Sequence, residues 1–309
     1  MVTLSPDLLQ HVQRIELQSR KVADSAFTGA YSSAFKGRGV EFADVRAYQP
    51  GDDVRTIDWN VTARTGEVFV KQFVEERELT LMLVVDVSAS ASFGSQLKTK
   101  LDVAAELAGV LGLAAVRSND KIGLVTIDRG IERVVPARKG RKHALRCVSE
   151  ILSSGTGRAR AARGGTHTDL AGASERLAQV LRRKALVVLV SDFLTGLAPE
   201  HLPGSELERG VQSLARRHDL ILAQLMDPRE RGLARSGLLE LRDLETGRRR
   251  LVDASSRRIR RAFEQEAGDL ERALTSMAIN AGGQYFPVYT DRGWAGALVE
   301  LFRARERRR

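Results

Sequence analysis

The chain contains one long apolar run that ends in a regularly spaced polar cluster, Leu79-Thr80-Leu81-Met82-Leu83-Val84-Val85-Asp86-Val87-Ser88-Ala89-Ser90. Strands that are apolar throughout are typical of parallel sheets covered on both faces, and ligand sites of such sheets lie beyond the carboxyl ends of the strands. Alternate residues of an extended segment point the same way, so oxygens of Asp86, Ser88 and Ser90 can converge on one small cation. The stretch therefore predicts a buried strand that ends in a cation site.

One carboxylate and two hydroxyls suit a hard divalent cation, with Mg²⁺ as the first expectation and Mn²⁺ or Ca²⁺ as alternatives. These ligands leave the ion with net positive charge, so it would attract a further anionic oxygen from elsewhere. The alternative interpretation is that both serine hydroxyls only cap the helix that follows the strand. The spacing alone leaves the two interpretations open.

The composition is that of an ordinary globular protein, with 309 residues, 43% of them hydrophobic and 28% charged. The longest apolar runs, residues 81–85 and 185–190, are far shorter than the roughly 20 residues of a membrane-spanning helix. The amino terminus lacks the apolar core of a signal peptide. We therefore expect a cytoplasmic protein without a membrane span. The single cysteine, Cys147, suggests a reducing compartment and is expected to be a buried, small apolar residue of a helix.

The net charge of +10 raises the possibility of a nucleic-acid-binding module. The positive charge lies in arginines interleaved with acidic residues, and aromatic residues are only 5% of the chain, so no stacking platform accompanies it. Residues 153–165, which lack any periodicity, predict a mobile basic loop, and residues 303–309 form an arginine-rich tail. Solvated helix faces or an acidic protein partner explain the same excess, so nucleic acid is the less favoured partner.

From residue 79 onward the pattern alternates between strands and helices, which indicates parallel-sheet units with crossover helices. We expect an α/β domain over residues 79–309, with a doubly wound, mostly parallel sheet and helices on both faces. The tripeptide Asp128-Arg129-Gly130 predicts a hairpin into an antiparallel edge strand. The predicted strands are 79–86, 121–127, 131–135, 185–191, 220–226 and 284–288, with a second hairpin at 238–244 and 248–253. The predicted helices are 96–117, 140–152, 168–182, 206–217, 255–280 with a mild interruption at Gly268, and one from 291 onward.

Residues 1–78 do not follow this alternation. They begin with an amphipathic helix at 6–22 and then become extended and turn-rich, with strands expected near 37–48 and 68–73. The region is too small and too poor in aromatic residues to fold alone, so we expect a β-rich N-terminal extension packed on the core. Its charged residues suit either an ion-pair network that ties the extension to the core, which we favour, or a partner-docking surface. These residues are Asp52, Asp53, Arg55, Asp58 and Arg64.

Three motifs lie at predicted strand ends or in a loop before a helix. They are Asp86-x-Ser88-x-Ser90, the loop Gly164-Gly165-Thr166-His167-Thr168, and Asp192 directly after the strand at 185–191. Together they resemble the metal-ion-dependent adhesion site of von Willebrand factor A domains. The resemblance implies a metal held by Asp86, Ser88, Ser90, Thr166 and Asp192. Thr168, Asp169 and Ser191 lie near this inferred site, and we expect them to support its ligands or cap a helix.

A second resemblance covers roughly residues 30–290. The segment from Glu41 to Arg64, which includes Pro50-Gly51-Asp52-Asp53 and Ile57-Asp58-Trp59-Asn60, resembles the signature of a bacterial family catalogued as domain of unknown function fifty-eight. Members of that family carry a von Willebrand A-like core and are often encoded beside MoxR-type AAA+ ATPases. Many also carry transmembrane helices before the signature, a feature that this sequence lacks.

The leading functional hypothesis is a noncatalytic, magnesium-dependent interaction or scaffold protein. A protein partner, a MoxR-type AAA+ ATPase or its client, would supply an Asp or Glu to the metal. The alternative is a phosphoryl-transfer enzyme that uses Asp86 as acceptor, but Ser88 stands where such enzymes place an acidic proton donor, and Lys184 precedes its strand. A basic nucleic-acid-binding module is the third hypothesis.

Overall fold

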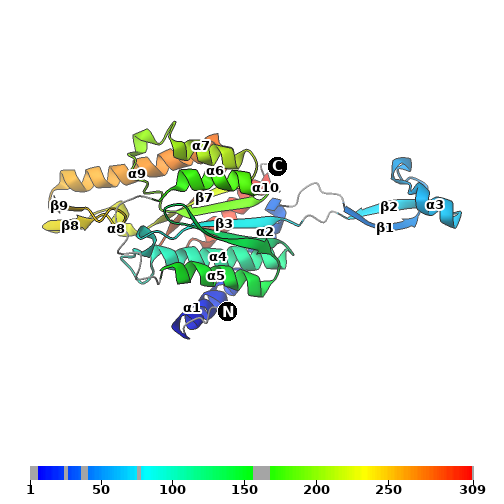
Figure 1. Cartoon of the computed structure of the whole chain (residues 1–309), viewed down its shortest axis with the longest axis horizontal. Coiled ribbons are helices and arrows are strands. Elements are labelled where there is room, and N and C mark those ends of the chain that lie inside the picture. Colours follow the sequence, from blue (N-terminus) through cyan, green and yellow to red (C-terminus); the bar gives the residue numbers. More distant parts are fainter. Residues whose placement is uncertain (1–5, 24–26, 36–40, 75–77, 156–167, 308–309) are drawn as a thin grey trace.

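The computed structural model describes residues 6–23, 27–35, 41–74, 78–155 and 168–307. Its centre is a six-stranded sheet in the order β10-β7-β6-β3-β4-β5, in which every neighbouring pair is parallel except β4 and β5 (Figure 1). The strands are β3 (Thr80–Asp86), β4 (Lys121–Ile127), β5 (Ile131–Arg138), β6 (Leu186–Ser191), β7 (Asp219–Met226) and β10 (Gln284–Tyr289). The predicted mostly parallel sheet with an antiparallel edge strand is confirmed.

Helices cover both faces of the sheet, as expected for strands that are apolar throughout. Alternate residues of β3 enter different cores: Leu81, Leu83 and Val85 belong to one apolar cluster, and Met82 and Val84 to the other. The first cluster is completed by α1 (Pro6–Val22), α2 (Thr28–Phe35), α4 (Lys100–Arg117), α5 (Arg141–Gly155) and α10 (Ala295–Arg307). The second is completed by α6 (Leu170–Val180), α7 (Glu206–Ala215) and α9 (Arg257–Asn280).

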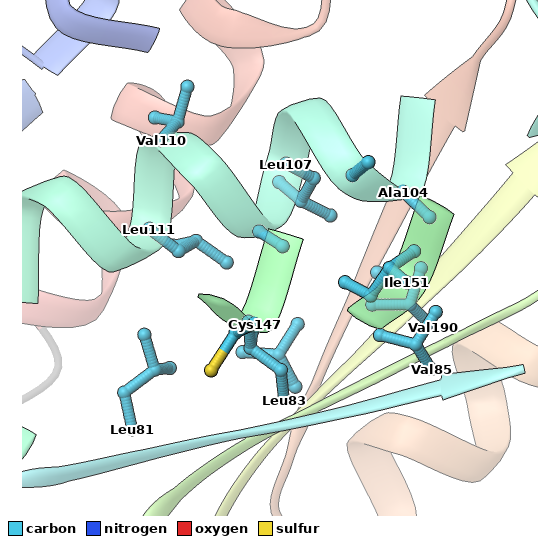
Figure 2. Packing of buried hydrophobic residues seen from close by; sticks show 14 of the residues in the cluster. Leu81, Leu83, Val85, Ala104, Leu107, Val110, Leu111, Cys147, Ile151 and Val190 are labelled. Carbon is cyan, nitrogen blue, oxygen red and sulfur yellow. The ribbon is translucent and has the colours of Figure 1, made fainter. Parts of the chain in front are cut away.

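The core around β3 shows how the apolar run is buried. Leu81, Leu83 and Val85 lie beneath α4 and α5 in Figure 2 and are fully buried. Cys147 of α5 is buried in the same cluster, as predicted, and burial raises the pKa of its thiol to about 12. A thiol with this pKa is protonated at neutral pH, which makes Cys147 a packing residue.

The N-terminal region contains two parts. In the first, α1 and α2 belong to the main core, where Tyr31 of α2 packs edge-on against Phe302 of α10 with ring centroids 5.7 Å apart. The second part is the antiparallel hairpin of β1 (Glu41–Ala47) and β2 (Phe69–Val74), with the short helices η2 (Val54–Thr56) and α3 (Trp59–Thr65) between its strands. In Figure 1 this hairpin unit lies well away from the central sheet. The domain boundary between residues 78 and 79 stays a prediction.

The structure corrects one prediction for the N-terminal region and gives the local contacts behind another. The segment after residue 22, predicted to be extended, contains the helix α2 instead. Within the hairpin unit, Arg46 donates two hydrogen bonds to the Asp52 carboxylate, at 2.7 and 2.6 Å, while Asp58 caps α3. Asp52 and Asp58 therefore support local turns of the hairpin unit, and the ion-pair network expected to tie the extension to the core stays a prediction.

A further antiparallel hairpin, β8 (Leu238–Arg242) and β9 (Arg249–Asp253), lies outside the six-stranded sheet, in the position predicted from the sequence. It follows α8 (Pro228–Arg231), and Figure 1 places it beside the start of α9. The remaining short helices are η3 (Ser90–Ser92) and η4 (Pro199–His201). Within the described ranges, no helix combines the length and apolarity needed to cross a membrane.

Candidate functional site

Of the five predicted oxygen ligands, the four that the structure describes lie at the carboxyl ends of two adjacent central strands. Asp86 ends β3, Asp192 directly follows β6, and these strands are parallel neighbours. The chain runs outward from β3 through β4 to β5 on one side, and through β6 and β7 to β10 on the other. The gap between β3 and β6 is therefore the point where strand order reverses, which is where doubly wound sheets bind ligands.

Asp86 is held by the ends of both strands. The Ser88 amide donates to Asp86 Oδ1 at 3.0 Å, and the Ser191 hydroxyl donates to Asp86 Oδ2 at 2.6 Å. The aspartate is only 3% exposed. Burial and the nearby negative charge of Asp192 raise the pKa of Asp86 to about 7, against the opposing effect of the serine hydrogen bonds. Two buried carboxylates that repel one another form a site that a cation would stabilise.

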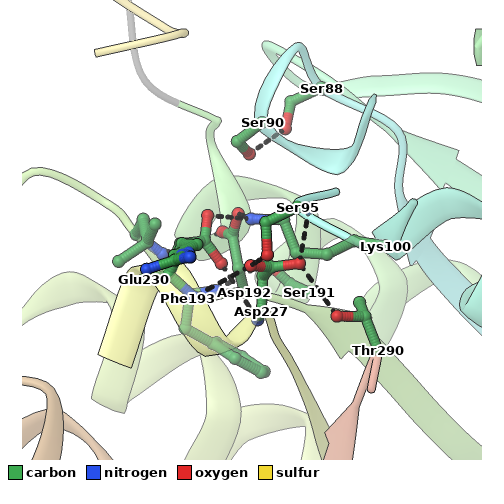
Figure 3. Close-up of polar contacts among 12 residues, drawn as sticks. Ser88, Ser90, Ser95, Lys100, Ser191, Asp192, Phe193, Asp227, Glu230 and Thr290 are labelled. Carbon is green, nitrogen blue, oxygen red and sulfur yellow. Dashed lines mark hydrogen bonds and ion pairs between the residues drawn. The ribbon is translucent and has the colours of Figure 1, made fainter. Parts of the chain in front are cut away.

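The two serines lie beside the aspartates. Ser88 Oγ and Ser90 Oγ lie 3.0 Å apart, as Figure 3 shows, and both residues are buried. Burial has the largest effect on the pKa of each aspartate and raises it, while the Ser88 side chain lowers the pKa of Asp86 and the Ser90 side chain lowers that of Asp192. The two hydroxyls contact one another, and the N-cap of the following helix η3 is Ala89.

A lysine that the sequence analysis did not single out provides a positive charge at this site. Lys100 Nζ donates to Asp192 Oδ2 and to Glu230 Oε1, both at 2.6 Å, and its side chain is 1% exposed (Figure 3). Burial opposes the ammonium, but the two carboxylates outweigh that effect and raise the pKa of Lys100. In turn, burial would raise the pKa of Asp192, but the Lys100 charge outweighs it and lowers that pKa. Asp192 is thus a stable carboxylate, whereas burial keeps the pKa of Glu230 raised.

The loop after β6 has an unusual backbone. Phe193 is buried and has φ = 59°, in the left-handed region that phenylalanine seldom adopts. Its amide donates to Ser191 Oγ at 2.9 Å, and the next amide, that of Leu194, donates to Asp192 Oδ1 at 3.0 Å. Side chains of the site therefore hold this strained turn in place.

Another buried aspartate, Asp227, fixes the segment that leads into α4. It follows β7 and accepts hydrogen bonds from the Ser95 amide at 2.9 Å and the Thr290 hydroxyl at 2.9 Å, and it caps α8 (Figure 3). These bonds tie the loop before Lys100 to the ends of β7 and β10. They are consistent with a structural role, because the carboxylate is satisfied by its own chain.

The other residues that the sequence predicted for this site lie in different parts of the chain. Thr166 lies outside the described residues. Thr168 is buried, and Asp169 is the N-cap of α6, where its carboxylate accepts from the Gly172 amide at 2.8 Å. Ser191 is buried beside Asp86 through the hydrogen bond already described.

Another residue absent from the sequence prediction reaches this edge from the β8–β9 hairpin. The Ser90 amide donates to Glu245 Oε1 at 2.9 Å, across 155 positions of sequence. An acidic side chain of the same chain thus contacts one of the serines of the predicted metal site.

The donor chemistry at this edge suits a hard cation. The converging groups are the oxygens of Asp86, Ser88, Ser90 and Asp192, and Mg²⁺ prefers oxygen ligands while retaining several waters. No group of three or more His, Cys, Asp or Glu side chains suited to a metal occurs within the ranges that the structure describes. A metal here would therefore depend on the serine hydroxyls and on water in addition to the two carboxylates.

Comparison with known proteins places the chain among bacterial relatives. It is 31% identical over 305 residues to the uncharacterized protein Rv1480 of Mycobacterium tuberculosis, which corresponds to 98% of this chain and 91% of the relative.

Similar solved structures include an aerotolerance-related membrane protein from Bacteroides fragilis, with 14% identity, a TM-score of 0.45 and coverage of 75% of this chain and 100% of that one. They also include a von Willebrand factor type A structure from Catenulispora acidiphila, with 12% identity, a TM-score of 0.39 and coverage of 77% and 43%. The expectation of a cytoplasmic protein is corrected at this point, because the first of these structures is described as a membrane protein.

The family match extends over most of the chain. The family described as "Protein of unknown function DUF58" matches residues 44–273, a range that starts within the signature noted in the sequence and includes Asp86, Lys100, Asp192 and Glu245. The family expected from the sequence is confirmed, and the chain belongs to the DUF58 family of proteins of unknown function.

Proposed function

We propose that this protein is a noncatalytic interaction protein that binds an acidic side chain of a protein partner through a divalent cation at the ends of β3 and β6. The observation that carries the proposal is the convergence of Asp86, Ser88, Ser90 and Asp192 at the reversal point of the sheet. The Ser88 amide donates to Asp86, the two serine hydroxyls lie 3.0 Å apart, and the charge of Asp192 acts on Asp86. The von Willebrand factor A resemblance of the three motifs agrees with this function.

The residues of the site have different roles in this proposal. Asp86 and the hydroxyls of Ser88 and Ser90 would hold Mg²⁺, with Thr166 as a further ligand from outside the described residues. Asp86 and Asp192 would hold the ion partly through water, because both oxygens of each carboxylate already accept hydrogen bonds from the chain. When bound, the cation supplies positive charge that attracts a carboxylate. Mn²⁺ and Ca²⁺ are the alternative ions.

The chemistry of the ion indicates the chemistry of the partner. A hard cation held largely by neutral hydroxyls retains an affinity for anionic oxygen, which a protein partner supplies as Asp or Glu. The family resemblance suggests a MoxR-type AAA+ ATPase, or a protein on which it acts, as the source of that residue. An ATPase that alternates between conformations would be suited to make or break such a contact.

The first experiment measures cation binding to the purified full chain. We expect Mn²⁺, used as an electron paramagnetic resonance probe and displaced by Mg²⁺, to bind the unchanged chain and to lose at least about tenfold in affinity in Asp86→Asn. Asp291→Asn is the matched control, because Asp291 is an exposed carboxylate just beyond β10 at the same edge of the sheet. Equal Mn²⁺ affinity in the unchanged chain and in Asp86→Asn would reject the proposed metal site.

A second experiment tests partner capture. The tagged chain is incubated with the purified MoxR-type ATPase of the same organism, in Mg²⁺ or in chelator, and binding should require both Mg²⁺ and Asp86. Hydrolysis of a general aryl phosphate by the unchanged chain, lost in Asp86→Asn, would instead support the phosphoryl-transfer alternative. The pairing of Lys100 weakens that alternative. Its ammonium is already neutralised by Asp192 and Glu230, so it is poorly placed to stabilise the negative charge of a bound phosphate.

A further inference from the structure

The contact between Glu245 and Ser90 joins two parts of the chain that share no sheet. Ser90 lies in η3 directly after the β3 aspartate loop, whereas Glu245 lies at the tip of the β8–β9 hairpin. The amide of Ser90 donates to the Glu245 carboxylate at 2.9 Å, while the hydroxyl of the same serine lies 3.0 Å from Ser88 Oγ. The carboxylate of Glu245 therefore contacts the backbone of a residue whose hydroxyl belongs to the proposed cation site.

The hairpin tip is shaped so that Glu245 is presented in a fixed direction. Asp243 Oδ1 accepts from the amides of Glu245, at 2.9 Å, and Thr246, at 3.2 Å, and the Asp243 carbonyl accepts from the Gly247 amide at 2.8 Å. Gly247 has φ = 72°, which glycine adopts without strain. The turn is thus organised by its own side chains, independently of the contact with Ser90.

The strands of the hairpin expose one face. Leu238 and Leu251 are 69% and 64% exposed, whereas Leu239 and Leu241 are half-buried, and β8 and β9 pair with one another outside the six-stranded sheet. At its base, the Ala254 amide donates to the Gly237 carbonyl at 3.0 Å, and Arg260 donates to the Ala254 carbonyl at 2.7 Å. A hairpin that is anchored at its base, exposed on one face of its strands and in contact at its tip can move about that base as a unit.

From these contacts we infer that Glu245 is an internal acidic ligand of the site, which a partner's Asp or Glu must displace. This inference rests on the proposed function, because it names the regulation of the same cation site. In the closed state the hairpin tip contacts Ser90, and Glu245 occupies the place beside the cation that a partner's carboxylate would take. In the open state the whole hairpin has moved away from Ser90, and that place is free for the partner.

Displacement has a measurable effect on affinity. A partner that binds only the open form has its apparent dissociation constant increased by the inverse of the open fraction, so a chain that is closed about 90% of the time binds about tenfold more weakly than an always-open chain. Removing the Glu245 carboxylate should therefore tighten partner binding by about tenfold or more, although no contact with the partner has been added.

The experiment compares Glu245→Ala and Glu245→Gln with Glu240→Ala, in the full chain. Glu240 is the matched control, because it is a carboxylate of the same hairpin whose side chain is 53% exposed and pairs with Arg249. Hydrogen exchange of the Ser90 amide, without added metal, reports the internal contact. Fluorescence anisotropy in Mg²⁺ reports binding of a labelled neutral peptide that carries one glutamate, with the glutamine version of the peptide as the negative probe.

Faster exchange at Ser90 and about tenfold tighter binding of the glutamate peptide are expected for Glu245→Ala, with no change for Glu240→Ala. Glu245→Gln retains an acceptor for the Ser90 amide but lacks the charge, so it should keep most of the protection and still bind the peptide more tightly. Unchanged peptide affinity in Glu245→Ala and Glu245→Gln, with normal binding by the unchanged chain, would overturn the inference and leave the proposed function standing. The proposed function itself would be overturned if neither the unchanged chain nor any variant bound the peptide, or if Asp86→Asn bound Mn²⁺ as tightly as the unchanged chain.

Discussion

At the scale of single residues, the charge of Lys100 governs the electrostatics of the site. Its ammonium lies between two carboxylates, those of Asp192 and Glu230, and it is almost completely buried. Charges buried in this way are stable only while they are paired, since each alone carries a large desolvation cost. Lys100 therefore acts as a permanent internal cation that offsets the negative charge of the strand ends, whether or not a divalent ion is present.

Replacement of Lys100 by methionine should be strongly destabilising. The variant keeps the length of the side chain but leaves the buried Asp192 carboxylate and the partly buried Glu230 carboxylate without their ammonium partner, which costs about 3–5 kcal/mol in the free energy of unfolding. Urea unfolding followed by circular dichroism measures this loss. The matched control is Lys98→Met, because Lys98 is 43% exposed and pairs with Glu106, so its loss should cost at most about 1 kcal/mol. Equal losses in the two variants would contradict the assigned role of Lys100.

Some residues of the site could be predicted from the sequence, and others could not. Asp86, Ser88 and Asp192 follow apolar runs, so their place at the sheet edge could be predicted. Lys100 lies in helical register with Ala104, Leu107 and Leu111, which are buried, and a lysine on that face was a usable signal of a buried ion pair. Glu245 gave no local signal, because its contact with Ser90 depends on a tertiary approach of two distant segments.

At the scale of elements, the first central strand is tied to the helix that follows it by one buried carboxylate. Asp120, in the turn between α4 and β4, accepts from the Leu79 amide at 2.9 Å and is 3% exposed. Burial raises the pKa of Asp120 to about 6, which the hydrogen bonds from Leu79 and Tyr31 offset only in part. The folded chain therefore holds a proton on Asp120 at pH values where the unfolded chain has released it.

This difference predicts the pH dependence of stability. Because the folded-state pKa lies above the ordinary value of 3.8, the contribution of protonated Asp120 is fully present below about pH 4 and is lost as the pH rises through about 6. The total change is at most about 3 kcal/mol, and Asp120→Asn should remove it, because asparagine retains an acceptor for the Leu79 amide without titrating. Urea unfolding of both proteins across this pH range measures the difference between them, and a constant difference would contradict the prediction.

Elements whose pattern is local were predictable, and those that depend on tertiary contacts were not. The strand predicted at 121–127 coincides with β4, since its apolar residues and its flanking turns are continuous in sequence. The helix α2 was missed because eight residues give little helical stability alone, and its packing against Phe302 supplies the rest. The mild interruption expected at Gly268 does not occur in α9, where the buried residues Leu274 and Met277 anchor the helix beyond it.

At the scale of the whole molecule, the alternation along the chain predicted a doubly wound, mostly parallel sheet, and the order of strands found in that sheet places the candidate site. What the alternation could not predict is the arrangement of the N-terminal region. Its first two helices enter the main core through Val12, Ile15 and Tyr31, whereas neither core cluster includes a residue of the hairpin unit at 41–74 among those described. Two large apolar side chains of that unit, those of Val54 and Trp59, are 63% and 68% exposed and so are not buried against the main core.

Because the hairpin unit at 41–74 is separate from both apolar clusters of the main sheet, we expect it to contribute little to the stability of the rest of the chain. Replacing residues 41–74 by a short Gly/Ser linker should leave the unfolding midpoint and the Mn²⁺ affinity of the chain unchanged. None of the proposed ligands is removed, and no residue described in this unit belongs to either apolar cluster of the main sheet. Since the chain has two tryptophans, Trp59 and Trp294, the shortened chain keeps Trp294 as its one fluorescent reporter of the core. Ile15→Ala is the positive control, because this buried α1 residue should cost about 2–5 kcal/mol. A shortened chain destabilised as much as Ile15→Ala would show instead that the hairpin unit is part of the folding core.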